Sequence, residues 1–487
     1  MERRNRFWTW AALLLLALTA AIPLAAPVFP TQDGPVHLYY VDVLRGLLHH
    51  SAPYAEHFQI KSSLTPYALE YYSLLALEFF FSPVLSEKVL VVAYIFAFGL
   101  GFRYLVESVA GRGSPWILTG IPFCLNMLLY MGFLNYCMAL AVLLFACGFW
   151  IRYAGRLTVW RTATMAGSLT LMLLTHPVPA AVFLIFTAIC LAAGRAHRNA
   201  RAILLVAGMA ILALAWVGPF LHPSLSGERN RNYLATMGWF DTVATELQLY
   251  HLSPFRSLIY RAGLILPIAL AGAAVIAGLC RRGMPFAARA LVAASAACFA
   301  AYCLVPQRMN GSFYFAERFP ILWVLFLLAG ASAIPLPRFW NLAAGGLAIA
   351  TTVGLLVQQH GKVDEIAARI ALADGMPPAK PGDVGLIVAS SRQTPPGLQF
   401  NPYMWSAVHY FRRSRAILAN DPWMDMPQIM LRPVRPNRWS YLDPDDAEAP
   451  FLRSAAGGTS AQDLDFVVHV GPPDPPAGSV LTVHRLR

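Results

Sequence analysis

The sequence predicts a mainly α-helical protein: a bundle of helices that crosses a membrane many times and carries a small α/β domain at its C-terminal end. Of the 487 residues, 57% are hydrophobic and only 13% are charged, whereas about 25% are charged in an ordinary soluble domain. The apolar residues gather in blocks long enough to cross a hydrocarbon core of about 30 Å. This pattern stops near residue 357, where the charged and proline-rich tail begins.

The apolar blocks indicate about eleven membrane crossings, within a range of ten to thirteen. Block 66–82 contains Glu70 and Glu78, and an ionisable side chain at the centre of a bilayer is costly. We therefore expect part of 66–106 to be a juxtamembrane or re-entrant element. The blocks lie near residues 8–29, 66–82, 86–106, 115–131, 133–151, 162–176, 179–194, 202–221, 258–280, 287–305, 319–335 and 339–357.

Basic residues predict which side of the membrane each connection occupies. The net charge is +12, and much of it lies in short connections between apolar blocks and before the first block, at Arg3, Arg4 and Arg6. Positive residues stay in the cytoplasm, so the charge reports topology and gives no support for nucleic-acid binding. The N-terminus is then cytoplasmic. Loops 30–65, 221–257 and 306–318, together with the tail, face outwards, as in a bacterial inner-membrane protein with a periplasmic domain.

The tail is expected to form a soluble domain over 358–487, after a transmembrane domain over 1–357. Four short runs of buried, β-branched residues predict strands at 384–390, 416–420, 465–471 and 479–486. A helix is predicted over 402–414. A small α/β fold fits this order of elements.

Residues 30–50 are the most informative segment, because they follow the first apolar block directly. Asp33 lies in a Thr-Gln-Asp-Gly-Pro turn, and residues 35–50 have the spacing of an amphipathic helix that lies on the membrane surface. His37 is on its polar side and is a candidate substrate contact. Two interpretations of Asp33 stay open: a helix cap or a functional carboxylate held just above the bilayer.

Polar side chains in other connections are also candidates for substrate binding. His176 stands in a Thr-His-Pro turn and could contact a phosphate, or it could cap a tight hairpin. Arginines in the outer loops suit an anionic phosphate or sugar, although these loops could simply be solvated. Glu70 could be functional or could form a structural ion pair. The remaining candidates are Arg229, Arg231, Arg308, Glu317 and Arg318.

This layout resembles the GT-C superfamily of membrane glycosyltransferases, in particular the protein O-mannosyltransferase and aminoarabinose transferase families. The resemblance rests on Asp33 just past the first span and on the helix that follows it. It also rests on the turn at His176, which is similar to a family turn with a basic residue, and on the outward tail. Glu70 corresponds loosely to a second acidic residue of the family.

The resemblance implies transfer of a sugar from a polyprenyl-phosphate carrier to an acceptor at the outer face. Asp33 would be the catalytic base, and the other candidates would bind substrate. The partners would be the lipid-linked donor, membrane lipid and an acceptor that the sequence does not identify. Some relatives use a divalent cation, but Asp33 alone is a poor metal site. The alternatives are a transporter or flippase for a lipid-linked glycan and a non-catalytic assembly protein.

Overall fold

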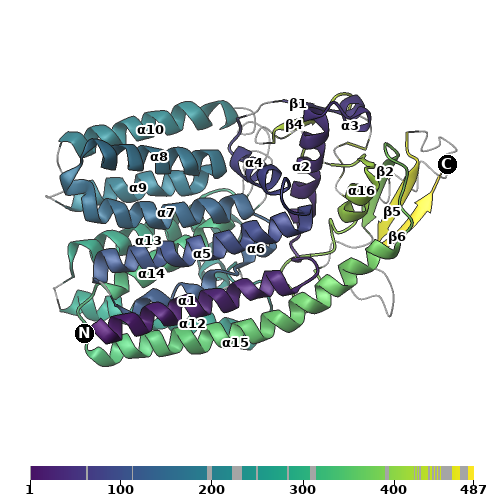
Figure 1. Ribbon diagram of the computed structural model, residues 1–487. Helices are drawn as coiled ribbons and strands as arrows, with labels where there is room; N and C mark the ends of the chain where they lie inside the picture. The colour runs from purple at the N-terminus through teal and green to yellow at the C-terminus, as the bar shows by residue number, and fades with distance from the viewer. Residues whose placement is uncertain are drawn as a thin grey trace. The chain divides into compact units, whose positions relative to one another are not determined.

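A computed structural model describes most of the chain (Figure 1). It does not describe residues 1, 62–63, 112, 195–199, 222–232, 248–250, 282–283, 308–313, 390–393, 422, 425, 427–428, 437–438, 441, 443, 445–446, 448–449, 451–462, 472–480 and 487.

Seven of the described helices are long and apolar enough to cross a membrane, so the chain is a multi-pass membrane protein. Their composition explains these helices, because long apolar segments with few charges satisfy their backbone polar groups within lipid by forming helices. They are α1 (Glu2–Ala25), α5 (Pro83–Ala110), α7 (Leu134–Tyr153), α10 (Ala200–Leu221), α12 (Leu258–Cys280), α13 (Phe286–Leu304) and α15 (Arg338–Ala371).

Shorter helices account for most of the other predicted blocks. These are α8 (Val159–Thr175), α9 (Pro177–Ala193) and α14 (Phe319–Ser332). A further helix, α11 (Tyr233–Leu247), lies within the predicted outer loop 221–257. Block 115–131 is not one helix: it consists of 3₁₀ turns at Pro115–Leu118 and Ile121–Phe123, followed by the short α6 (Met127–Tyr130). Within this part of the protein, α8, α9 and α10 lie side by side, and α14 packs against α12 and α13 (Figure 1).

The structure agrees with the expectation for 66–106. Its first part is α4 (Ala68–Leu77), a helix of 10 residues. Such a helix is about 15 Å long and is too short to cross the hydrocarbon core. Its second part is the long apolar helix α5.

The C-terminal segment forms the α/β fold that the sequence predicts. The strands β2 (Val384–Ala389), β3 (Ile417–Leu418), β5 (Phe466–Val470) and β6 (Leu481–Arg485) make a sheet of order β3-β2-β5-β6, in which β6 alone is antiparallel to its neighbour. The predicted helix at 402–414 is the shorter α16 (Val408–Ser414). A buried cluster that includes Leu386, Val467 and Trp439 forms the core.

A second, two-stranded sheet joins distant parts of the sequence. The strand β1 (Phe58–Ile60) follows α3 (Ala52–His57) and pairs antiparallel with β4 (Leu431–Pro433). The segment after the first apolar helix therefore shares a fold with the C-terminal segment.

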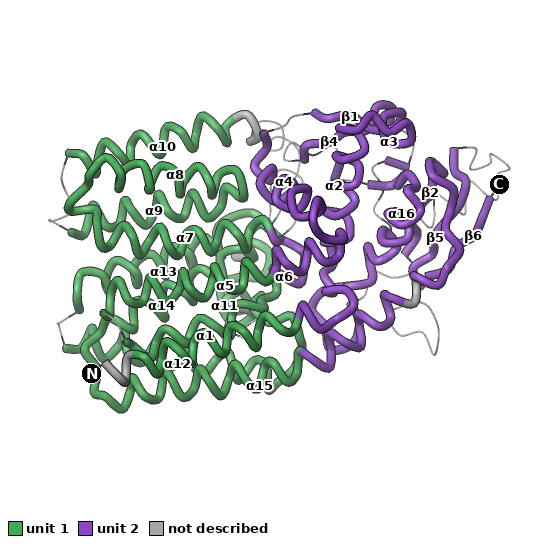
Figure 2. Tube along the Cα trace, viewed as in Figure 1, with its two compact units in different colours: residues 1–22, 92–128, 135–359 green, residues 23–91, 129–134, 360–487 purple. Residues whose placement is uncertain are grey.

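The chain divides into two compact units, shown in different colours in Figure 2. Unit 1 contains residues 1–22, 92–128 and 135–359, which include most of the apolar helices. Unit 2 contains residues 23–91, 129–134 and 360–487. It holds α2 (Gly34–Leu48), α3, α4, both sheets and α16.

Candidate active site

Asp33 occupies the N-cap position, directly before Gly34 of α2, but its side chain does not cap the helix. The backbone of Asp33 has helical angles, and the carboxylate makes no capping hydrogen bond to the first helical amides. Instead, Gln32 Nε2 donates to Asp33 Oδ1 over 3.3 Å. The side chain is buried, with 6% of the residue exposed. Asp33 therefore does not act as a helix cap. Its carboxylate is buried, and the surrounding backbone determines its position.

The segment after α6 holds the backbone at Asp33. The backbone N–H of Gln32 donates to the Tyr130 carbonyl over 2.9 Å, and the backbone N–H of Asp33 donates to the Met131 carbonyl over 3.2 Å. Gly132 follows with a φ of +90°. A Cβ atom at Gly132 would lie 2.8 Å from the Gly34 amide nitrogen and 2.9 Å from Asp33 Cβ. Only glycine accommodates both the left-handed backbone and this close approach.

A narrow cavity of about 10 Å³, near the limit for a single water molecule, begins beside Asp33 and is lined by Thr31, Gly34, His37, Glu70 and Glu87 among others. Two of the residues predicted from sequence, His37 and Glu70, thus lie together. Thr31 donates its hydroxyl to Glu87 Oε1 over 3.2 Å. A Cβ atom on Gly34 would lie 2.0 Å from Thr31 Oγ1, so a glycine is required here as well.

His37 is neutral at physiological pH. Burial lowers the pKa of its imidazole to about 4, because removing a charged ring from water disfavours the charged form. Its Nδ1 lies 3.2 Å from the Tyr71 hydroxyl, and they share a hydrogen bond. His37 therefore offers this cavity a neutral hydrogen-bonding group and no positive charge.

Sequence reasoning missed Glu87 and Lys88, which stand near the start of α5. Both residues are buried, and the Lys88 ammonium donates to the carbonyl of Ala26. Two adjacent ionisable residues at the edge of an apolar block are a signal in themselves, since intramembrane charges mark functional or paired positions.

The helix α2 is correctly predicted, but it is not a surface helix with one exposed polar side. Twelve of its 15 residues are buried, including Tyr39, Tyr40 and Asp42. The Tyr39 hydroxyl donates to the Ala416 carbonyl over 3.3 Å, and the Tyr40 hydroxyl donates to Asp421 Oδ1 over 2.8 Å. The polar side of α2 therefore packs against the C-terminal α/β fold.

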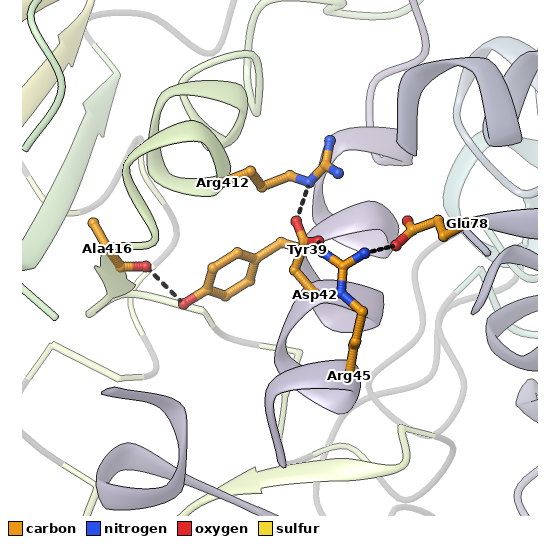
Figure 3. Close-up of polar contacts among 6 residues, drawn as sticks. All are labelled: Tyr39, Asp42, Arg45, Glu78, Arg412 and Ala416. Carbon is orange, nitrogen blue, oxygen red and sulfur yellow. Dashed lines mark hydrogen bonds and ion pairs between the residues drawn. The ribbon is translucent and has the colours of Figure 1, made fainter. Parts of the chain in front are cut away.

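Charged residues connect α2 to α4 and α16, as Figure 3 shows. Asp42 accepts from Arg412 Nε over 2.8 Å and from Arg45 Nη2 over 2.7 Å. Arg45 also donates to Glu78 over 3.0 Å. Burial and the neighbouring Asp42 raise the pKa of Glu78 to about 7. The helix α2, which directly follows Asp33, is thus held by a chain of four charged residues.

A second group of predicted residues lies in unit 1. His176 caps α9, because its Nδ1 accepts from the Val178 amide over 3.2 Å, as the hairpin interpretation predicts. The ring of Tyr136 meets His176 edge-on, with 5.3 Å between the centroids. The Tyr136 hydroxyl donates to the Arg318 carbonyl over 2.5 Å. His176 and Arg318 therefore share Tyr136 as a neighbour, and Glu317 and Arg318 are both buried.

Three predicted residues, Arg229, Arg231 and Arg308, lie outside the described residues. Among the described residues, no group of three or more His, Cys, Asp or Glu side chains could hold a metal ion.

Comparison with known proteins identifies the fold. No protein-family model matches the chain, and no curated protein matches its sequence. The crystal structure of ArnT from Cupriavidus metallidurans in the apo state matches 95% of this chain and 93% of its own, with a TM-score of 0.51 and 11% sequence identity. ArnT is a GT-C aminoarabinose transferase. The chain therefore has the predicted GT-C-like membrane fold, and an identity this low carries the fold alone.

Proposed function

We propose that this protein is a GT-C-type glycosyltransferase that moves a sugar from a polyprenyl-phosphate carrier to an acceptor, with Asp33 as the catalytic base. One observation carries the proposal. The first acidic residue past the first apolar helix is buried, is held through its backbone by residues 130–131, and does not use its carboxylate as a helix cap. The likeness to ArnT supports it through the fold.

In the proposed reaction the Asp33 carboxylate accepts the proton of an acceptor hydroxyl. The hydroxyl oxygen then forms a bond to the anomeric carbon of the sugar. The bond between that carbon and the phosphate oxygen breaks, and polyprenyl phosphate departs with the electron pair. A carboxylate placed against the nucleophile contributes by general base catalysis, typically about 10²–10⁴-fold.

The departing phosphate needs positive charge. In unit 2, Lys88 supplies a buried ammonium next in sequence to Glu87, a residue of the cavity beside Asp33. We assign Lys88 to the phosphate on this ground. Arg318 and His176 of unit 1, and Arg229, Arg231 and Arg308 outside the described residues, stay proposals from the sequence for binding the donor.

The proposed location is the outer face of a bacterial inner membrane. The support is the charge pattern, with Arg3, Arg4 and Arg6 before the first apolar helix and arginines in alternate connections. A lipid-phosphate donor suits that face, because it carries its leaving group in the membrane and needs no nucleotide.

The test measures donor consumption by the full-length protein in liposomes made with native membrane lipids, which supply the acceptor. The donors are polyprenyl-phosphate hexoses and pentoses, and mass spectrometry follows the release of polyprenyl phosphate. We expect Asp33→Asn to abolish release and the control Asp364→Asn, at a partly exposed position on α15, to retain it. Equal release by wild type and Asp33→Asn would remove Asp33 from the mechanism. Movement of an intact lipid-linked glycan across the bilayer, without release, would favour the flippase.

A further inference from the structure

A second and larger cavity lies within unit 2, between the two sheets. Its volume is about 430 Å³, within the range of small-molecule sites, about 300–1,000 Å³. On one side it is bounded by Ile417 and Leu418 of the edge strand β3, and on the other by Phe58 of β1 and Pro433 of β4. None of its lining residues lines the narrow cavity near Asp33, so the two cavities are separate.

The lining of this cavity combines polar and apolar groups. Asp421, Ser440 and Met424 are buried and form its inner part, whereas Glu56, Arg435 and Asp463 are exposed and stand at its rim. Carboxylate and hydroxyl groups can hydrogen-bond the hydroxyls of a sugar ring. The apolar side chains of Leu418 and Met424 can cover its C–H faces. A phosphate or a purely apolar ligand would use only part of this surface.

Acidic groups outnumber basic ones at this cavity. Glu56, Asp421 and Asp463 contribute three carboxyl groups, and Arg435 contributes the guanidinium. Burial lowers the pKa of the neighbouring His57 imidazole, so that ring adds no compensating charge at neutral pH. A like charge is repelled, and the cavity therefore disfavours phosphorylated ligands.

The inner wall is fixed in place by α2. Asp421 Oδ1 accepts hydrogen bonds from the Tyr40 hydroxyl over 2.8 Å and from the Trp423 amide over 3.1 Å. The Leu418 amide donates to the Tyr39 hydroxyl over 3.0 Å. A wall held by hydrogen bonds is preorganised, which lowers the entropic cost of ligand binding.

We propose that the cavity between β3 and the β1–β4 sheet binds an unphosphorylated sugar, neutral or amino-substituted. This adds a binding site to the proposed function and does not depend on Asp33. In a glycosyltransferase it would hold a sugar of the acceptor rather than the phosphate-bearing donor.

The experiment uses the full-length protein in phospholipid nanodiscs, since many detergents carry sugar headgroups. Saturation-transfer NMR measures the binding of glucose, glucosamine and glucose 6-phosphate. We expect binding of glucose or glucosamine, and at least about tenfold weaker binding of glucose 6-phosphate, which corresponds to about 1.4 kcal/mol.

Two rim residues provide the variants. The double variant Glu56→Ala/Asp463→Ala, at exposed positions, should weaken sugar binding about tenfold or more. Glu365→Ala, an exposed control on α15 that lies away from the cavity lining, should bind as wild type does, and so should Asp33→Asn. Absence of binding by both unphosphorylated sugars, binding unchanged in the double variant, or a preference for glucose 6-phosphate would each overturn the proposal. Loss of donor consumption in Asp33→Asn would concern the catalytic base and would not contradict the proposed sugar site.

Discussion

Asp42 on α2 and Arg412 on α16 form a buried ion pair, with 2.8 Å between Asp42 Oδ2 and Arg412 Nε, and their side chains are 9% and 7% exposed. The two residues are 370 positions apart in the sequence. The pair joins α2, which directly follows Asp33, to the C-terminal α/β fold (Figure 3). The tail is thereby part of the structure that holds the candidate base.

Removing one member of this pair should destabilise the protein strongly. Arg412→Met would leave Asp42 buried with Arg45 as its one remaining ionic partner among the described residues, and breaking a buried pair costs about 3–5 kcal/mol. Thermal unfolding in nanodiscs measures the effect. The adjacent Arg413→Met, at a side chain that is 30% exposed, is the control and should change stability little. Equal unfolding temperatures for Arg412→Met and wild type would show that the pair does not hold the fold.

The raised pKa of Glu78 predicts a pH dependence of stability. The pKa of Glu78 is about 7 in the folded protein, whereas the ordinary value for a glutamate, as in the unfolded chain, is 4.5. A group whose pKa is raised by folding favours the folded state at low pH, and this contribution is lost as pH rises through the folded-state pKa. Wild type should therefore lose stability between about pH 4.5 and pH 7 relative to Glu78→Gln. Parallel stability curves over that range would contradict the prediction.

Gly132→Ala should displace Asp33. The substitution combines a left-handed backbone at φ +90° with contacts of 2.8–2.9 Å to Gly34 and Asp33. Gly111 provides a matched control, because its φ is +80° but a Cβ atom there would meet nothing within 4 Å. Both changes impose backbone strain of about 1–2 kcal/mol. Only Gly132→Ala should also abolish donor consumption, and similar activity in the two variants would mean that Asp33 tolerates the shift.

Local patterns in the sequence predicted most secondary structure. The strand β2 follows from a short run of valine, leucine and isoleucine, and the early end of α4 follows from Glu70 and Glu78 in an apolar block. The start of α2 follows from the Gly34-Pro35 turn. The GT-C-like fold class could be predicted because the order of these elements is itself visible in the sequence.

Long-range contacts could not be predicted in the same way. The apolar stripe of α2 indicated one buried side, yet Tyr39 and Tyr40 bury the other side against residues 416–421. Glu87 and Lys88 were hidden because hydropathy averages over a whole block, and two charges barely change the mean of a helix of 28 residues. Only the fold shows that the Glu87 carboxylate accepts a hydrogen bond from the hydroxyl of Thr31, two residues before Asp33.

Lys88 gives the sharpest test of how the departing phosphate is stabilised. If its ammonium meets the phosphate in the transition state, Lys88→Met should lower turnover by about 10²–10³-fold, the usual loss when one such electrostatic contact is removed. Lys88→Arg keeps the charge and should retain part of the activity. Lys362→Met, at a side chain that is 52% exposed, is the control. Turnover and KM should be measured with variants whose unfolding temperature matches that of wild type. A rise in KM at unchanged turnover would mean that Lys88 binds donor and transition state equally. Unchanged values of both would show that Lys88 does not stabilise the departing phosphate.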